Sequence, residues 1–156
     1  MVKNHGAFIW SVADLLRGDY AAAAARFGEL VARQPPSPAA TYYWGEALDS
    51  LGDHDRAQAA YAAVASLGEA NLAGAAEAGV YLAYAYEKLG RPDDAIAVYV
   101  RLLGEGETAD LHAYLGMLYS EKGAANLAQT EYERSLALNP QHLPALYGLG
   151  SLAYAR

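Results

Sequence analysis

Four glycines at nearly regular intervals constrain the fold of this chain more than any other feature of its sequence. Each opens a short turn segment: Gly18-Asp19-Tyr20, Gly52-Asp53-His54, Gly90-Arg91-Pro92 and Gly123-Ala124-Ala125. The glycines are separated by 34, 38 and 33 residues. A residue with positive φ can end a helix and reverse the chain, and glycine takes this conformation without steric cost. The period therefore predicts a solenoid built from helix–turn–helix hairpins.

The segments between these turns carry a second repeated pattern, a small residue four positions before an aromatic one. It occurs in each predicted second helix: Ala23 and Phe27, Ala57 and Tyr61, Ala95 and Tyr99, and Ala128 and Tyr132. Residues four apart share one face of a helix, so the small residue allows a neighbouring helix to approach while the ring fills the remaining space. Pro35 and Pro140 stand where a second helix has to stop, because proline cannot continue it.

The clearest copy of the repeat combines Leu115-Gly116, Tyr119, Gly123, Ala128, Tyr132 and Pro140. In these residues the chain resembles the tetratricopeptide repeat (TPR) family, and the resemblance extends over nearly its whole length. It implies an all-α fold, a right-handed superhelix of antiparallel helix pairs in a single domain. We expect units at about 4–37, 38–75, 76–108 and 109–142, followed by a lone C-terminal helix at 143–156. Residues 66–75 would supply the four extra residues of the longest spacing.

A second resemblance is confined to the N-terminus. Residues 8–20 resemble the opening of the methyltransferase subunit of type I restriction-modification systems. The rest of the chain contains no Asn-Pro-Pro-Phe-like catalytic motif and no glycine-rich cofactor loop. The resemblance therefore implies no methyltransferase activity, and a remnant of a DNA-modification complex is the least favoured interpretation.

Charge and composition disfavour several classes of function. The formal net charge is −7, which repels nucleic-acid phosphates and anionic membranes. The chain has no cysteine, so disulfides and cysteine-ligated zinc are excluded. No apolar run approaches the roughly 18 residues of a membrane span, and residues 1–20 do not resemble a signal peptide. We expect a cytoplasmic protein that neither enters a membrane nor binds nucleic acid.

The titratable residues do not form a recognisable catalytic or metal-binding motif. The four histidines are His5, His54, His112 and His142. None lies three or four positions from another candidate ligand on one helix face, which argues against a metal site. His112 is expected to pack between helices and His54 to lie at a turn. Since nucleophile-elbow and phosphate-loop spacings are also missing, we expect a protein that is not an enzyme and needs no cofactor.

The TPR resemblance also implies where a partner would bind. In stacked TPR hairpins, one stripe of each first helix lines the concave side. The candidate partner-binding residues at these positions are Tyr42, Glu46, Asp49, Val80, Tyr84, Glu87, Met117 and Tyr147. Tyrosine provides a large contact area at low entropic cost, and acidic neighbours select a basic or amphipathic partner. Some TPR proteins hold a C-terminal carboxylate with Lys, Asn and Arg on this stripe, a mode disfavoured here by Phe8, Val12, Tyr42 and Glu46.

These patterns favour a non-catalytic adaptor or scaffold that binds a protein or peptide in its groove. The tyrosines could instead pack between helices, because an alanine-rich stack must fill its volume. Two further hypotheses are self-assembly through uncapped apolar ends and a bacterial secretion-type chaperone, which also resembles about three repeats in a small acidic chain. In the self-assembly hypothesis, residues 143–156 would mediate homo-oligomerisation, because they are apolar on several sides.

Overall fold

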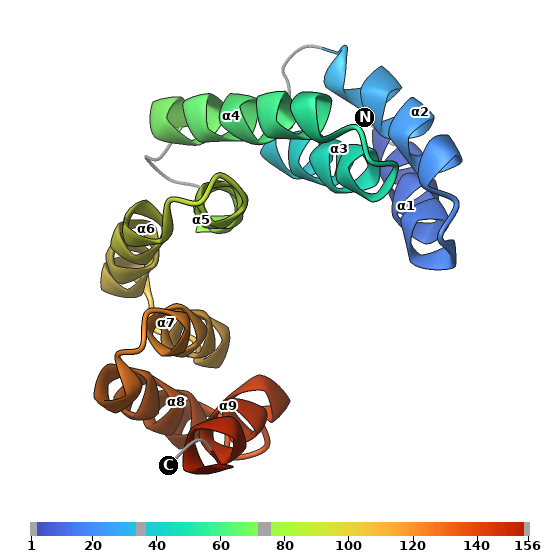
Figure 1. Cartoon of the computed structure of the whole chain (residues 1–156). Coiled ribbons are helices and arrows are strands. Elements are labelled where there is room, and N and C mark those ends of the chain that lie inside the picture. Colours follow the sequence, from blue (N-terminus) through green and yellow to red (C-terminus); the bar gives the residue numbers. More distant parts are fainter. Residues whose placement is uncertain (1–2, 34–36, 72–75, 155–156) are drawn as a thin grey trace. The chain divides into compact units, whose positions relative to one another are not determined.

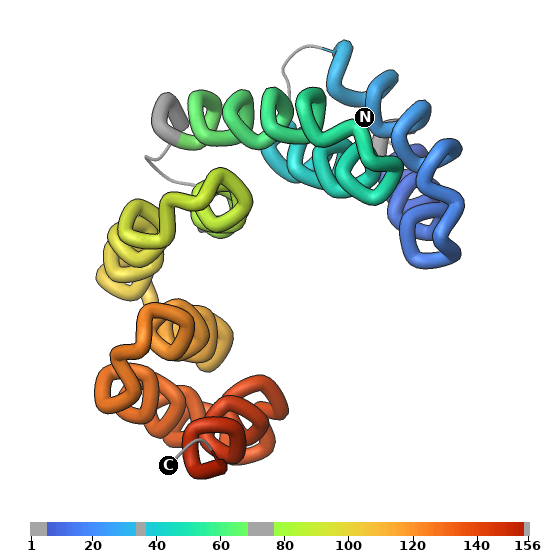
Figure 2. Tube along the Cα trace, viewed as in Figure 1, coloured from blue at the N-terminus to red at the C-terminus, as the bar shows by residue number. Residues whose placement is uncertain are grey.

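A computed structural model describes residues 3–33, 37–71 and 76–154 of the chain. Within this described part, all regular secondary structure is helical, as the repeat pattern predicts (Figure 1). The chain, traced in Figure 2, divides into two units, Met1–Arg91 and Pro92–Arg156, and each is compact by itself. None of the described helices is long and apolar enough to cross a membrane.

The unit Met1–Arg91 contains the first five described helices. They are α1 (Lys3–Arg17), α2 (Tyr20–Val31), α3 (Pro38–Ser50), α4 (His54–Asn71) and α5 (Ala76–Lys88). Each helix contacts the next one in the sequence, and α3 also contacts α1 and α5. In this unit α1, α3 and α5 are therefore the first helices of successive hairpins, and they lie next to one another.

The unit Pro92–Arg156 contains the remaining described helices. They are α6 (Pro92–Glu105), α7 (Ala109–Glu121), α8 (Ala125–Leu138) and α9 (Leu143–Tyr154). Consecutive helices again pack together, and α7 also contacts α9. The helix α9 thus lies beside α7 in the way that a further first helix would.

The four turn glycines are confirmed as helix ends. Gly18, Gly52, Gly90 and Gly123 have φ angles between 69° and 80°, and no other described residue has a positive φ. At the second turn, the Gly52 N–H donates to the Asp49 carbonyl at 2.9 Å, and the Asp53 N–H donates to the Leu48 carbonyl at 3.0 Å. The other three turns have the same pair of bonds. This Schellman arrangement satisfies carbonyls that a helix end would otherwise leave unpaired.

Side-chain caps start helices on the other side of these turns and loops. Ser37 Oγ accepts a hydrogen bond from the Ala40 N–H at 3.3 Å, and Pro38 follows in the first turn of α3, where a missing N–H is harmless. Thr108 Oγ1 accepts from the Leu111 N–H at 3.2 Å at the start of α7. The local sequence therefore defines both ends of these helices.

The small and aromatic pairs of the second helices form the contacts predicted for them. All eight residues are at most 2% exposed: Ala23, Phe27, Ala57, Tyr61, Ala95, Tyr99, Ala128 and Tyr132. For two of the rings, those of Tyr61 and Tyr132, a glycine on the facing first helix makes room. A Cβ added at Gly45 would lie 2.6 Å from Tyr61 Cε1, and one added at Gly116 would lie 2.6 Å from Tyr132 Cε1. A larger residue at either glycine would separate the two helices of its hairpin.

Seven aromatic rings form a connected core in the unit Met1–Arg91. They come from all five of its described helices: Phe8, Phe27, Tyr42, Tyr43, Tyr61, Tyr81 and Tyr84. Neighbouring ring centroids are 5.6 to 6.1 Å apart, within the range of favourable edge-to-face and offset contacts. These rings hold successive hairpins of the unit together.

The longest turn spacing has a structural origin in α4. This helix has 18 residues, whereas α2, α6 and α8 have 12 to 14. Part of the predicted insertion at 66–75 therefore lengthens a helix, and residues 72–75 lie outside the described part. Pro35 also lies outside it, while α8 ends at Leu138, two residues before Pro140. The repeat boundaries themselves stay a prediction.

Candidate functional site

Three of the candidate partner-binding residues lie on α3 and α5 of the unit Met1–Arg91, and two of them, Tyr42 and Tyr84, belong to its aromatic core. Tyr42 on α3 is 9% exposed, and its ring centroid lies 5.6 Å from that of Tyr84 on α5. Tyr84 and Val80 are half-buried on α5. Tyr42 thus contributes mainly to packing, as the alternative interpretation of the tyrosines anticipates, while its role in partner binding stays a prediction.

Glu46 connects three helices of the same unit. Its Oε1 accepts a hydrogen bond from the Tyr61 hydroxyl at 3.0 Å and pairs with Lys88 Nζ at 2.6 Å. Burial raises the pKa of Tyr61 and of Tyr42 far above the usual tyrosine value, and the negative charge of Glu46 adds to both shifts. Both hydroxyls therefore stay neutral, and the carboxylate of Glu46 is already neutralised by a lysine of the same chain.

The other two acidic candidates of this unit lie near the helix ends. Asp49 Oδ1 accepts a hydrogen bond from Nδ1 of the exposed His54 at 2.6 Å, across the turn between α3 and α4. His54 is the first residue of α4 and directly follows the turn at Gly52-Asp53. Glu87 is half-buried in the last turns of α5. Both Glu46 and Asp49 therefore already interact with side chains of their own chain.

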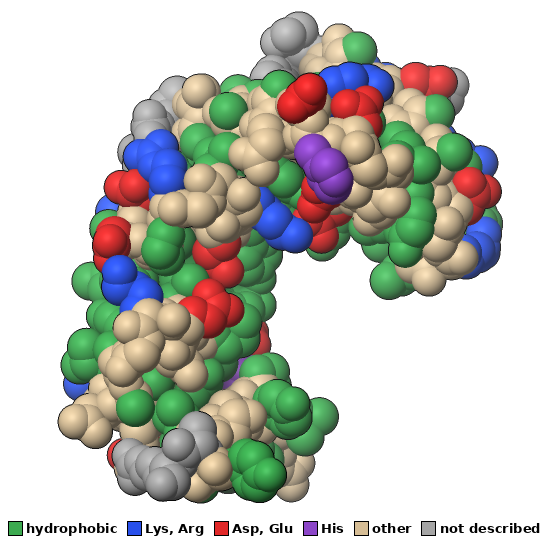
Figure 3. All heavy atoms as spheres, in the orientation of Figure 1, with side chains coloured by type: hydrophobic (Ala, Val, Ile, Leu, Met, Phe, Trp, Pro, Cys, Tyr) green, Lys and Arg blue, Asp and Glu red, His purple; other side chains and the backbone are tan. Residues whose placement is uncertain are grey.

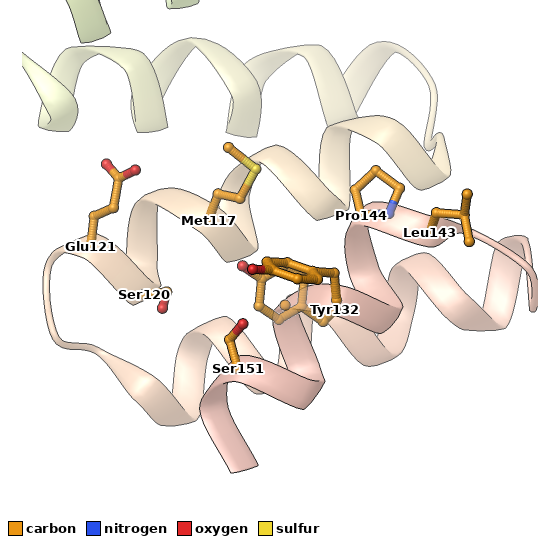
Figure 4. Close-up of a pocket in the computed structure, with 9 residues that line it drawn as sticks. Met117, Ser120, Glu121, Tyr132, Leu143, Pro144 and Ser151 are labelled. Atoms are coloured by element: carbon orange, nitrogen blue, oxygen red, sulfur yellow. The ribbon is translucent and has the colours of Figure 1, made fainter. Parts of the chain in front are cut away.

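The last two candidates, Met117 and Tyr147, lie in an open pocket of the unit Pro92–Arg156. The pocket has a volume of about 560 Å³ and lies between α7, α8 and α9. Its lining consists of Met117, Ser120, Glu121, Tyr132, Leu143, Pro144, Tyr147, Gly148 and Ser151 (Figure 4). Met117 is 40% exposed and Tyr147 is 80% exposed. We call this the α7–α9 pocket, and here the stripe residues of two first helices face one open space.

The ring of Tyr132 is fixed between two glycines beside the pocket. A Cβ at Gly116 of α7 would meet one part of the ring, and a Cβ at Gly148 of α9 would overlap its Cζ and both Cε atoms. Burial raises the pKa of Tyr132, and the negative charge of Glu121 raises it further. The pocket therefore has a rigid aromatic wall whose hydroxyl stays neutral.

Polar and apolar side chains lie at opposite ends of this pocket. Figure 4 shows Glu121 and Ser120 at the end where α7 finishes, and Leu143 and Pro144 at the start of α9, with Met117 and Tyr132 between them. Ser151 lies on α9 below Tyr132 in this view. The pocket thus has a polar end and an apolar end.

Several pocket residues were not among the sequence-based candidates, although a signal for some of them was present. Continuing the 34-residue register from Asp110 and Met117 on α7 leads to Pro144 and Ser151 on α9. The repeat spacing alone could therefore have added Pro144 and Ser151 to the candidate residues. Glu121 and Gly148 lie outside the stripe positions, and only the packing of α9 against α8 brings Gly148 onto Tyr132.

A buried polar network lies elsewhere in the same unit. The Nδ1–H of His112, which is 2% exposed, donates to Glu131 Oε2 at 2.7 Å, and Glu131 Oε1 pairs with Arg134 Nη1 at 2.9 Å. His112 is therefore confirmed as an interhelical packing residue. Among the described side chains, no group of three or more His, Cys, Asp or Glu residues is arranged to hold a metal ion.

The structure also brings a serine, a histidine and an aspartate together. His142 Nδ1 lies 2.9 Å from Ser135 Oγ, and His142 Nε2 lies 2.8 Å from Asp110 Oδ1. Ser135 is fully buried, and its hydroxyl donates to the Ala109 carbonyl at 2.8 Å. A nucleophile must be reachable by its substrate, so this arrangement links α7 and α8 to the start of α9 and does not form a hydrolytic site.

Exposed apolar side chains gather on the helices nearest the two chain ends. On α1 they are Ile9, Trp10 and Leu16, and on α9 they are Leu143, Leu146, Tyr147 and Tyr154. Figure 3 shows hydrophobic side chains clustered at the position of α9. Trp10 is 57% exposed, whereas Trp44, the other tryptophan of the chain, is half-buried. Large exposed apolar groups of this kind mark surfaces available for contact with other molecules.

Comparison with protein families gives matches along most of the chain. A family model described as tetratricopeptide repeat matches residues 13–71 and 44–110, and another model of the same description matches residues 109–142. None of the curated proteins matches the chain. The resemblance of residues 8–20 to restriction-system methyltransferases is not shown by these matches, and these residues form most of α1 and the turn after it.

Solved structures with a similar fold cover nearly the whole chain. One is a thermophilic TPR protein from Thermus thermophilus, with 19% identity, a TM-score of 0.55, and coverage of 97% of this chain and 99% of that chain. Another is MamA from Desulfovibrio magneticus RS-1, with 20% identity, a TM-score of 0.66 and coverage of 99% and 86%. The APC/C hetero-tetramer Cut9-Hcn1 has 21% identity, a TM-score of 0.69 and coverage of 94% and 29%. At these identities the likeness concerns the fold.

Proposed function

Because this chain belongs to the tetratricopeptide repeat family, a fold of protein-interaction modules, we propose that it is a non-catalytic adaptor that binds an extended peptide along its first helices. One of the structurally similar chains belongs to a hetero-tetramer, which supports a role in holding another protein. The proposal depends on surfaces within each unit, taken separately.

The α7–α9 pocket is the observation that carries this proposal. It is open, it is lined mainly by apolar side chains, and its volume of about 560 Å³ lies within the usual range of ligand sites, about 300 to 1,000 Å³. Two neighbouring first helices contribute exposed side chains to its lining, those of Met117 and Tyr147. In the other unit, Glu46 is paired with Lys88 and Tyr42 is buried, so that part of the stripe is less available.

Rigidity of the pocket wall favours binding. The ring of Tyr132 packs against Gly116 on α7 and Gly148 on α9. The ring therefore has a fixed position, and α7 and α9 a fixed separation, before a peptide binds. A preformed site loses less conformational entropy on binding than a flexible one. A modest contact area can therefore give a measurable affinity.

A displayed library of random dodecapeptides, selected on the full-length chain, tests this function. We expect enrichment on the wild-type chain and at least about tenfold weaker binding of the enriched peptides to the Met117→Ala, Tyr147→Ala double variant, since apolar and aromatic anchors dominate peptide interfaces. The matched control is Leu138→Ala, which removes an exposed apolar side chain of α8 outside the pocket.

Circular dichroism and thermal melting of all three proteins show whether the substituted side chains contribute to folding. Equal enrichment on the wild-type chain and on the folded double variant would refute the pocket as the binding site. Failure of the wild-type chain to enrich any peptide would refute the proposed function itself.

Self-assembly is the second candidate function, and the exposed apolar side chains of α9 favour it. Leu143, Leu146 and Tyr154 are between 45% and 95% exposed. If they join two copies, the mass measured by size-exclusion chromatography with light scattering rises above 16.6 kDa as the concentration increases a hundredfold. Leu146→Lys should then restore the monomer mass. A constant monomer mass for the wild-type chain would exclude this candidate.

A further inference from the structure

Among the residues that the structure describes, Glu121 alone brings a charge to the α7–α9 pocket, at its polar end. Glu121 is exposed, and no described residue forms an ion pair or a hydrogen bond with its carboxylate. Its sequence neighbour Lys122 pairs instead with Asp93, through Nζ and Oδ1 at 2.7 Å. This differs from Glu46 in the other unit, whose carboxylate is matched by Lys88. Glu121 is therefore an available acceptor for a cation from outside the chain.

The neighbouring side chains add to this preference for a cation. Ser120 and Ser151 provide hydroxyl oxygens, and none of the lysines, arginines and histidines in the described part of the chain lines the pocket. The charge of Glu121 also reaches the pocket wall, because it contributes to the raised pKa of Tyr132. An ammonium or guanidinium group at this end could bind the carboxylate of Glu121 and the hydroxyl oxygens of the two serines.

The other end of the pocket has the opposite chemistry. Leu143 and Pro144 carry no side-chain polar group, and the thioether of Met117 lies between them and the polar end (Figure 4). Leu143 is 75% exposed, so a large apolar group placed here would remove a substantial apolar area from water. The volume of about 560 Å³ is large enough for more than one side chain of a bound peptide.

From this polarity we infer that the α7–α9 pocket selects a peptide segment in which a large apolar side chain and a lysine or arginine side chain lie next to each other. The apolar side chain contacts Met117, Leu143 and Pro144, and the cation pairs with Glu121. This inference depends on the proposed peptide-binding function. It adds the chemistry of the bound peptide and the orientation of that peptide between the two ends of the pocket. Glu121 is the residue that determines specificity, and Met117 and Tyr147 provide the affinity.

The test uses the same displayed dodecapeptide library and compares the composition of the selected peptides. On the wild-type chain we expect enrichment of Lys or Arg close to Leu, Ile, Met or Phe. On the Glu121→Lys variant we expect this basic preference to disappear and Asp or Glu to take its place. Glu107→Lys changes the net charge equally, at an exposed position outside the pocket, and should leave the basic preference intact.

Affinities of individual peptides give a second readout. For the best basic peptide, Glu121→Gln should weaken binding about two- to fivefold, the range of a partly exposed ion pair, and the difference should shrink at high salt. The same peptide with norleucine in place of its lysine should bind the wild-type chain and Glu121→Gln equally.

The outcomes separate this inference from the proposed function. Enrichment that depends on Met117 and Tyr147 but shows no basic preference would overturn the inference and leave the binding function standing. A basic preference that persists unchanged in Glu121→Lys would also overturn it, because the selection would then come from another acidic surface. Absence of any pocket-dependent enrichment would refute both.

Discussion

Gly148 shows how a residue without a side chain can shape a binding site. A Cβ at this position would overlap the ring of Tyr132, so only glycine allows α9 to approach α8 closely enough to complete the α7–α9 pocket. Gly150, on the same helix, has no atom within 4 Å of an added Cβ. Alanine at Gly148 would change both the packing and the helix propensity of α9, whereas alanine at Gly150 would change only the helix propensity. Comparing the two substitutions therefore isolates the effect of close packing.

We expect opposite effects of alanine at these two positions. Gly150→Ala should raise the free energy of unfolding by about 0.5 to 1 kcal/mol, because alanine loses less backbone entropy in a helix. Gly148→Ala should lower it by about 1 to 3 kcal/mol through overpacking against Tyr132. Urea denaturation monitored by circular dichroism measures both. Stabilisation by Gly148→Ala would contradict the described contact.

The buried tyrosines give the protein a pH dependence in the alkaline range. Because the pKa values of Tyr42, Tyr61 and Tyr132 are raised, the native state keeps protons that the unfolded state releases above about pH 10. The stabilising effect is complete below that pH and is lost as the pH rises toward the folded-state values. The free energy of unfolding should therefore fall as the pH rises above about 10.

Tyr61→Phe tests this dependence at one residue. It removes the hydroxyl that donates to Glu46, so we expect a loss of about 1 kcal/mol near neutral pH. The variant should also show a shallower decrease in stability above about pH 10 than the wild-type chain. Urea titrations at several pH values give both quantities, and an unchanged slope above pH 10 would contradict the raised pKa of Tyr61.

At the scale of elements, the sequence predicted the helices and turns well because their determinants are local. A turn glycine, a capping Ser37 or Thr108 and a small residue four before an aromatic one act within a few positions of the chain. The excess length of α4 was attributed only to residues 66–75, since helix ends within an alanine-rich segment have no distinct signal. The division of the structure after Arg91 also falls inside a predicted repeat, 76–108.

The candidate site was less predictable because it depends on which side chains meet. The repeat register placed Met117 and Tyr147 on the stripe, and the structure brings both to one pocket. The same register could not show that Tyr42 would be enclosed by other rings or that Glu46 would pair with Lys88. Those contacts depend on side-chain packing between three helices.

The turn glycines provide a prediction at this scale. Gly52 has a φ of 80° and free space around an added Cβ, so Gly52→Ala isolates the cost of a left-handed backbone, about 1 to 2 kcal/mol. Gly104→Ala near the end of α6 is the control, because its Cβ also meets no atom and its φ is not positive. Thermal melting of both variants measures the difference. Equal stability would contradict the helix-ending role of Gly52.

At the scale of the whole molecule, the two units differ in how much of their stripe is available. In Met1–Arg91 the stripe residues Tyr42 and Tyr84 contact each other through their rings, and Glu46 pairs with Lys88. In Pro92–Arg156 the corresponding side chains line an open pocket with an unpaired carboxylate among the described residues. We therefore expect binding energy to be concentrated in the second unit, while the first contributes mainly a stable packed stack.

Chemical-shift mapping by NMR of the full-length chain, with and without a peptide enriched by the library, tests this central claim most directly. We predict that the largest changes occur at the Met117 methyl group, the Tyr147 ring and the backbone amides of Gly116 and Gly148. The resonances of Tyr42 and Tyr84 should change little. Changes concentrated on the aromatic core of Met1–Arg91 or on the exposed face of α1, with the pocket resonances unmoved, would contradict it.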